Sequence, residues 1–310
     1  MTDRRVLKKN FVTAARDPFR VAEVLRIPPI APTKGAPPPT SNSETLEIGG
    51  TDWGPVLTAW LDAYQAAEAG YAVLAYDSQA KLHAHFNKLL DSSDGNLLIP
   101  ALQSVCRSTH HVAVAADQEA TSQDHAKLHN AVTLLQESFS RTINDRKEYH
   151  PQAPLSEEGS KKAGVLAIVN ELFAIYFRLN TLRLCRNLLR PVETRKLHEQ
   201  GSMGHLVTYR YYVGRLYLFE DQYQDADDHL EFAFSMCHKN AVHNKKAILR
   251  YLVPVKIFRG RLPSPQLLAK YGLEEFVSIV DSIRKGDLRT FNNALIEYQH
   301  RFIRYVVRRM

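Results

Sequence analysis

The sequence has little cysteine and no long apolar run. Its 310 residues include three cysteines, Cys106, Cys185 and Cys237, which lie far apart. An odd number at such distances argues against a disulfide framework and fits buried thiols in a reducing compartment. No stretch approaches the roughly 18 uncharged apolar residues of a membrane helix, and the charged N-terminus lacks the apolar core of a secretory signal. We therefore expect neither secretion nor a membrane partner.

The sequence also lacks the motifs of common enzymes. His125 and His129 have the i, i+4 spacing of zinc ligands, but no glutamate follows His125 and no third ligand is placed. Neither a Gly-x-Ser-x-Gly elbow nor a phosphate-binding loop with its lysine occurs. A surface pair is the simpler interpretation of the two histidines. The sequence therefore predicts no catalytic residue, no metal site and no cofactor.

Strand alternation is absent too, whereas apolar residues recur at helical spacing after residue 50. The expected helices cover residues 53–64, 71–89, 97–116, 125–146, 165–189, 241–258, 265–271, 273–285 and 287–310, with a helix pair in the stretch 209–251. The helix at 165–189 has two apolar faces, which is typical of the middle of a helical stack, and Pro191 is expected to end it. The fold class expected is all-α: a right-handed helical-repeat solenoid of antiparallel pairs over residues 51–310.

The pattern of residues 209–251 is typical of a tetratricopeptide unit, in which two helices are joined by a tight turn. Gly214 and Ala226 are small where the two axes are expected to approach to about 8–10 Å. The residues predicted to pack the pair are Gly214, Tyr217, Tyr223, Ala226, Leu230 and Ala233. Because such a unit cannot bury its apolar face alone, neighbouring helices are expected on both sides.

Proline marks a boundary near the N-terminus. Six of the 18 residues from 26 to 43 are proline, which removes backbone donors and restricts the preceding residue. We therefore expect residues 1–50 to form a flexible, Pro-rich segment, with a linker at 26–43. Residues 51–150 are expected to hold N-terminal helical repeats, and residues 151–310 a second group of repeats.

Positive charge is concentrated at the C-terminal end of the chain. The formal net charge is +7, to which residues 1–50 contribute +3, residues 51–240 contribute −5 and residues 241–310 contribute +9. Such a block indicates a polyanionic partner. The alternative interpretation is an ordinary solvated helix surface.

Nine basic residues are the candidates for contact with nucleic acid or an acidic partner. Helical spacing divides them into three groups: Lys245, Lys246 and Arg250; Lys256, Arg259 and Arg261; and Arg301, Arg304 and Arg308. Arginines in a stripe can follow phosphates without reading a base sequence. Tyr298 and Tyr305 lie near the last group; they either stack on bases or belong to the core, which is the favoured interpretation.

Several motifs, mostly in the second half of the chain, resemble one known family. They are Asn170-Glu171, Leu184-Cys185, Tyr211-Tyr212-Val213-Gly214, Ala233-Phe234, Cys237-His238, Asn244-Lys245, Tyr251-Leu252-Val253-Pro254 and Gly286-Asp287-Leu288. The sequence is similar to the PCI-domain family that includes COP9 signalosome subunit 12, PCI-domain-containing protein 2 and the PCI subunit of the mRNA export complex TREX-2. Ile143-Asn144-Asp145-Arg146 is most similar to the fungal branch. Ala163, before Gly164, departs from the bulky residue usual there.

The resemblance implies the helical-repeat part of a PCI module that acts as a scaffold and not as an enzyme. It implies a second PCI-domain protein and a small acidic disordered protein of the proteasome-lid type as partners, with RNA or DNA as a further one. It also implies work on mRNA in the nucleus, with the cytoplasm as a second location. A PCI module ends in a winged helix, which is expected to be absent from these 310 residues. A module whose main role is direct contact with RNA or DNA stays open as an alternative function.

Overall fold

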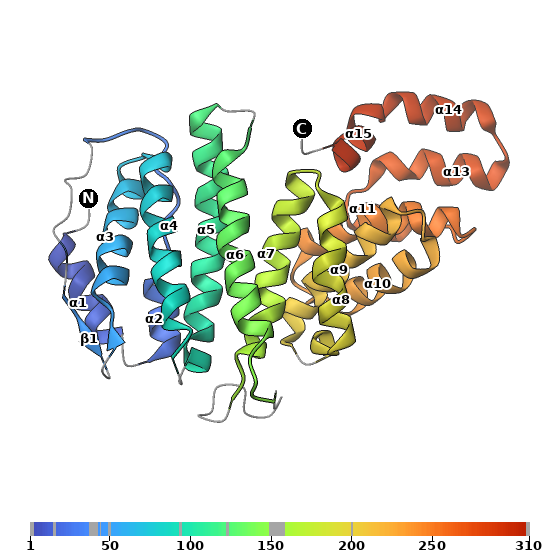
Figure 1. Ribbon diagram of the computed structural model, residues 1–310. Helices are drawn as coiled ribbons and strands as arrows, with labels where there is room; N and C mark the ends of the chain where they lie inside the picture. The colour runs from blue at the N-terminus through green and yellow to red at the C-terminus, as the bar shows by residue number, and fades with distance from the viewer. Residues whose placement is uncertain are drawn as a thin grey trace. The chain divides into compact units, whose positions relative to one another are not determined.

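The structure is a computed structural model, and it describes residues 3–14, 17–36, 43, 45–48, 51–92, 95–121, 124–148, 159–199 and 201–307. The chain divides into two compact units, Met1–Ile175 and Tyr176–Met310 (Figure 1). The regular secondary structure of the described part is helical, apart from two antiparallel strands of two residues each, β1 (Glu47–Ile48) and β2 (Thr51–Asp52). The predicted all-α, helical-repeat class is therefore confirmed.

The first unit is built from helices that pack side by side. They are α1 (Arg4–Ala14), α2 (Pro18–Val24), α3 (Gly54–Glu68), α4 (Ala72–Leu89), α5 (Ile99–Ala120), α6 (Ala126–Ile143) and α7 (Val165–Arg178), the last of which runs on into the second unit. From α3 to α6 consecutive helices lie side by side and alternate in direction (Figure 1). Trp60, Tyr76, Phe86 and Leu102 fill the space between α3, α4 and α5, each at most 1% exposed.

The boundary expected at residue 150 is wrong, because the elements after it pack on the first unit. The 3-10 turn η2 (Lys161–Gly164) packs against α5 and α6. On α7, Glu171 is hydrogen-bonded to His110 of α5 at 2.6 Å. The division therefore falls inside α7, at residue 175.

A row of polar side chains runs through the core of the first unit. Gln79, His83 and Asn87 follow each other at four-residue spacing along α4, and all three are buried. His83 lies 2.9 Å from Oγ1 of Thr109 and 2.8 Å from Oγ of Ser138. Ser138 in turn donates to Oδ1 of Asn87 at 2.6 Å. Burial lowers the pKa of His83 to about 3, so the imidazole is neutral and the network is held by hydrogen bonds without a charge.

The prediction of a flexible N-terminal segment is wrong for residues 4–14 and 17–25, which form α1 and α2 and the turn after α2. Phe11 of α1 is fully buried, and its ring centre lies 5.7 Å from that of Trp60 in α3. Arg4 forms an ion pair with Asp62 at 3.0 Å. Leu25, after α2, is also fully buried. The charges of this segment lie on the outer side of short amphipathic helices, whose apolar side covers α3 and α5.

The proline-rich stretch forms no helix over residues 26–36, as expected, but it is fixed to the end of α3. The N–H groups of Ala31 and Gly35 donate to the carbonyls of Ala67 and Ala69, at 3.1 and 2.7 Å. Gly70 makes room for it, because a Cβ atom there would lie 2.9 Å from a backbone carbonyl oxygen of this stretch. The linker interpretation is therefore wrong for residues 26–36, whereas residues 37–42 lie outside the described part.

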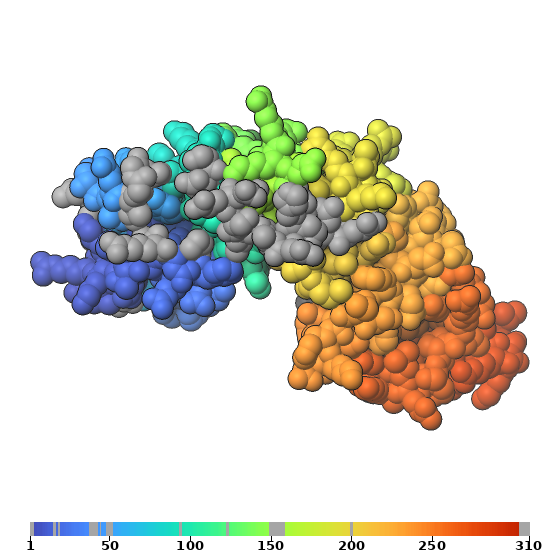
Figure 2. All heavy atoms as spheres, turned by 90° about the horizontal axis from the view of Figure 1, so that it is seen from below, coloured from blue at the N-terminus to red at the C-terminus, as the bar shows by residue number. Residues whose placement is uncertain are grey.

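The second unit continues with shorter helices. They are α8 (Cys185–Thr194), α9 (Met203–Phe219), α10 (Tyr223–Met236), α11 (Val242–Phe258), α12 (Pro265–Lys270), α13 (Val277–Lys285), α14 (Leu288–Glu297) and α15 (Gln299–Val307). Leu230, Leu249, Leu268 and Val280, at most 1% exposed, belong to one core shared by α10 to α13. In the space-filling view the orange atoms of this part form one continuous packed body (Figure 2).

Two predicted helices are each divided in the structure. The helix expected at 165–189 breaks at Asn180, which adopts a φ of 55°, a region that asparagine tolerates better than most residues. The chain then resumes in the 3-10 turn η3 (Leu182–Leu184) and α8, and Pro191 lies inside α8 without ending it. The helix expected at 287–310 is divided at Tyr298 into α14 and α15.

Helices α9 and α10 form the expected packed pair. Ala226, Leu230 and Ala233 are fully buried. The atom nearest to a Cβ added on Gly214 would be Cγ of Leu230, at 2.7 Å. The remaining two predicted packing residues are half-buried: Tyr217 lies 5.3 Å from the His229 ring and Tyr223 stacks on Phe258 at 4.9 Å.

Candidate nucleic-acid interface

The two lysines near the start of α11 have partners inside the protein. Lys245 is 8% exposed, and its ammonium donates to the carbonyl of Phe234 at 2.8 Å. Lys246 donates to the carbonyl of Gly272, also at 2.8 Å. These carbonyls lie at or just after the C-terminal ends of α10 and α12, where a positive charge is favourable. Contact with a polyanion is therefore the wrong interpretation for Lys245, and Lys246 is engaged as a cap; Arg250, the third of the group, is half-buried.

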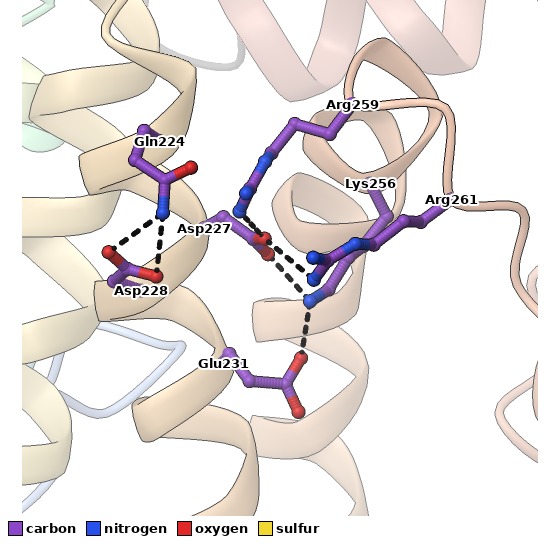
Figure 3. Close-up of polar contacts among 7 residues, drawn as sticks. All are labelled: Gln224, Asp227, Asp228, Glu231, Lys256, Arg259 and Arg261. Atoms are coloured by element: carbon purple, nitrogen blue, oxygen red, sulfur yellow. Dashed lines mark hydrogen bonds and ion pairs between the residues drawn. The ribbon is translucent and has the colours of Figure 1, made fainter.

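Three cations at the C-terminal end of α11 surround one buried carboxylate. Asp227 of α10 is 2% exposed, and Lys256, Arg259 and Arg261 point towards it (Figure 3). Lys256 Nζ lies 2.7 Å from Oδ1, and Arg261 Nη1 lies 3.8 Å from Oδ2. Arg259 forms a hydrogen-bonded ion pair with the same Oδ2. The three basic residues therefore do lie together, as predicted. The anion that they bind is the carboxylate of Asp227, on the adjacent helix α10.

The charges of this cluster are largely balanced within it. Lys256 also lies 2.9 Å from Glu231, so three positive groups face two carboxylates. Burial alone would lower the pKa of Lys256, but the hydrogen bonds to Asp227 and Glu231 outweigh burial and raise it. Arg261 is 64% exposed, against 20% for Lys256, and is the outermost cation of the three. Little of the predicted positive field therefore remains here for an external phosphate.

The arginine stripe predicted at the C-terminal end is described only at its first member. Arg301 lies 3.2 Å from the carboxylate of Glu275, which is buried. Its guanidinium also lies 5.4 Å from the centre of the half-buried Tyr298 ring. The side chains of Arg304 and Tyr305, and the whole of Arg308, lie outside the described residues. Arg301, like Lys256 and Arg259, is therefore paired with a carboxylate inside the protein.

A buried arginine that sequence reasoning missed lies among aromatic rings. Arg215 of α9 is 4% exposed. Its guanidinium carbon lies 4.2 Å from the ring centre of Phe177, 4.4 Å from that of Tyr251 and 5.3 Å from that of Tyr211. The electron-rich faces of the rings stabilise the positive charge in place of a carboxylate. The tyrosines of the family-like motifs therefore have a packing role, which no spacing along one helix could indicate.

The described residues do not assemble a metal centre or a membrane span. Within them, no group of three or more His, Cys, Asp or Glu side chains converges on a point where an ion could be held. His125 adopts a φ of 46° at the start of α6, and its Nδ1 lies 4.0 Å from the carboxylate of Asp117. Nor does any helix in the described ranges combine the length and apolar character needed to cross a bilayer.

Comparison with known proteins decides the family. No protein-family model matches the chain. Its sequence is 32% identical over 254 residues to PCI domain-containing protein 2 of Xenopus laevis, which covers 80% of this chain and 62% of that protein. It is 33% identical over 258 residues to Enhanced ethylene response protein 5 of Arabidopsis thaliana, covering 82% and 59%. It is 30% identical over 285 residues to a CSN12 homolog of Neurospora crassa, covering 82% and 56%.

The chain belongs to this PCI-domain family. It spans 56% to 62% of the length of these three relatives. Two family-like motifs of this PCI chain have clear structural roles. The Asp145 carboxylate accepts from Oγ of Ser160 at 2.9 Å and from the N–H of Lys161 at 2.7 Å, which ties the end of α6 to the start of η2. Gly286 ends α13 with a φ of 67°, and Asp287 caps α14 through its side chain, as the sequence predicts.

Proposed function

We propose that this chain is a non-catalytic scaffold subunit of a nuclear PCI complex that acts on mRNA, in export or in transcription-coupled RNA processing. The observation that supports this most is the similarity to PCI domain-containing protein 2 and to a CSN12 homolog over about four fifths of the chain. Antiparallel helix pairs suit such a role, because a row of them offers an extended surface to other proteins.

The proposed partners are a second PCI-domain protein and a small acidic disordered protein of the proteasome-lid type. Residues 176–310 hold 23 Lys and Arg against 13 Asp and Glu, a net charge of +10, whereas residues 1–175 hold 17 against 20, a net charge of −3. An acidic disordered segment would therefore be attracted to the second unit.

Affinity purification of the tagged 310-residue chain from nuclear extract, followed by mass spectrometry, tests the proposal. We expect a second PCI-domain protein and a small acidic protein in amounts comparable to the chain. Co-expression with the recovered PCI protein and size-exclusion chromatography should then give a one-to-one complex. Repeated recovery of the chain alone, or with no PCI-domain protein, would contradict the scaffold role.

Direct contact with nucleic acid as the main role is a second candidate function, favoured by the +10 charge of the second unit. In that case the isolated chain would bind RNA, with an affinity that falls steeply as salt concentration rises. Binding that occurs only when the PCI partner is present would instead support the scaffold role.

A further inference from the structure

One face of α8 carries two arginines that no described residue of the protein neutralises. Cys185, Leu188 and Val192 are buried, so the opposite side of this helix points outward. The residues of that outward side are all exposed: Arg183, at the junction of η3 and α8, then Asn187, Arg190 and Thr194. They follow each other at intervals of three or four residues, which places them in one row. We call this row the α8 face.

The two arginines of the α8 face have no partner among the residues that the structure describes. In the described part of the chain, neither Arg183 nor Arg190 takes part in a hydrogen bond or an ion pair. Arg186, which lies between them on the flank, differs: it is paired with Glu220, and its guanidinium lies 5.0 Å from the Tyr217 ring centre. Lys245, Lys256 and Arg301 also differ from Arg183 and Arg190, because each of them has an internal acceptor. Among the described residues, Arg183 and Arg190 therefore differ from these predicted cations in having no internal acceptor.

The chemistry of the α8 face fits phosphate better than it fits a protein segment. All four side chains donate hydrogen bonds, and arginine, asparagine and threonine are among the side chains that contact phosphate oxygens. No carboxylate lies in the row, since Glu193 is half-buried on its flank. The row also contains no apolar side chain, because the exposed Leu184 is about a quarter turn away. A peptide or helix that docks in a groove needs such apolar anchors.

We propose that the α8 face, defined by Arg183, Asn187, Arg190 and Thr194, binds the phosphodiester backbone of nucleic acid. The inference rests on the second candidate function, direct contact with nucleic acid, and names the surface that makes it. Arg183 and Arg190 are about 10 Å apart along the helix, at 1.5 Å per residue. At about 3.4 Å of duplex axis per nucleotide, this distance corresponds to roughly three nucleotide steps of one strand. The contact therefore carries no base preference.

The test measures binding of a fluorescein-labelled 20-nucleotide single-stranded RNA to the full chain at several salt concentrations, with DNA of the same sequence as a second arm. In single strands each phosphate contact contributes about 0.7 to the slope of log affinity against log salt. The double variant Arg183→Gln/Arg190→Gln should therefore lower the slope by about 1.4 and weaken binding about 25-fold at 0.1 M salt. Each single variant should lower the slope by about 0.7 and weaken binding about fivefold. DNA should show the same losses, because the contact is to phosphate.

A control of equal charge separates this face from the net charge of the unit. Lys239→Gln/Arg289→Gln removes two exposed positive charges from other helix ends, and its RNA affinity should stay within about threefold of the unaltered chain. Equal losses in both double variants, or no loss in the α8 variants, would overturn the inference while leaving RNA binding itself intact. A chain that binds polyglutamate but neither RNA nor DNA would overturn the second candidate function as well. If the double variant loses its helical circular dichroism, the two single variants decide.

Discussion

Gly214 and Leu230 are in such close contact that a Cβ atom on the glycine would lie 2.7 Å from Cγ of the leucine. The same Cβ atom would lie 3.2 Å from Cβ of His229. Both neighbours belong to α10, so the missing side chain of Gly214 allows α9 and α10 to pack as closely as they do. Ala226, the small residue predicted at this contact, is fully buried.

Replacing Gly214 by leucine should destabilise the second unit. The extra carbons would overlap Leu230 and His229, and such overpacking costs about 1–3 kcal/mol. Gly204→Leu is the matched control, because Gly204 is in the same helix and has nothing within 4 Å of an added Cβ atom. Thermal unfolding followed by circular dichroism measures both. Equal melting temperatures for the two variants would show that the contact at Gly214 is not tight.

The Asp227 cluster predicts a large difference between two adjacent aspartates. Asp227→Asn would leave Lys256 and Arg259, each 20% exposed, without their shared carboxylate, and should cost about 3 kcal/mol of unfolding free energy. Asp228→Asn removes an exposed carboxylate whose contact is with Gln224, and should change stability by less than about 0.5 kcal/mol. Urea unfolding of both variants tests this. A cost below about 1 kcal/mol for Asp227→Asn would mean that the cluster is solvated and contributes as a surface ion pair does.

Lys245 should behave as a core residue although it is charged. Lys245→Glu would put a carboxylate against the carbonyl of Phe234 and remove a charge-assisted hydrogen bond, at a cost of at least about 2 kcal/mol. Lys239→Glu makes the same change of charge at an exposed position a few residues earlier, and should be close to neutral. Unfolding curves distinguish the two. If Lys245→Glu and Lys239→Glu are equally stable, Lys245 is not a core residue and is again a candidate for contact with phosphate.

The neutral His83 predicts acid sensitivity of the first unit. The unfolded chain takes up a proton at this histidine below pH of about 6.5, whereas the folded state, with a pKa of about 3, does not. The free energy of unfolding should therefore fall as pH decreases from about 6.5 to 3, by up to about 1.4 kcal/mol per pH unit. In His83→Gln, which keeps a donor and an acceptor, this part of the slope should disappear.

Urea unfolding at pH 7.5, 6 and 5 measures that slope. The exposed His129→Gln is the control and should leave the slope unchanged. Burial also lowers the pKa of His229, to about 4, so part of the acid sensitivity remains in both variants. A slope in His83→Gln that equals the slope of the unaltered chain would show that His83 can take up a proton in the folded state.

The positions of most helices could be predicted from the sequence, because helix formation is mainly local. The apolar period placed α3 to α6 and α9 to α11 to within a few residues. Ser264 caps α12 and the pair Gly286-Asp287 separates α13 from α14, as predicted. The breaks at Asn180 and Tyr298 were missed, since the apolar pattern continues through both. Helices α1 and α2 were also missed, because their burial depends on contacts with α3 and α5, far along the chain.

The sequence by itself thus determined the helical class, the helix ends marked by strong caps, and a net positive charge in the second half of the chain. Which of those charges remain available was decided only by the tertiary structure. Lys256 and Arg259 find Asp227 about 30 residues away on another helix, whereas Arg183 and Arg190 find no acceptor in the described residues. The physical reason is that a charge is neutralised by what lies within a few ångströms of it in space, and spacing along one helix contains no information about the side chains of the next.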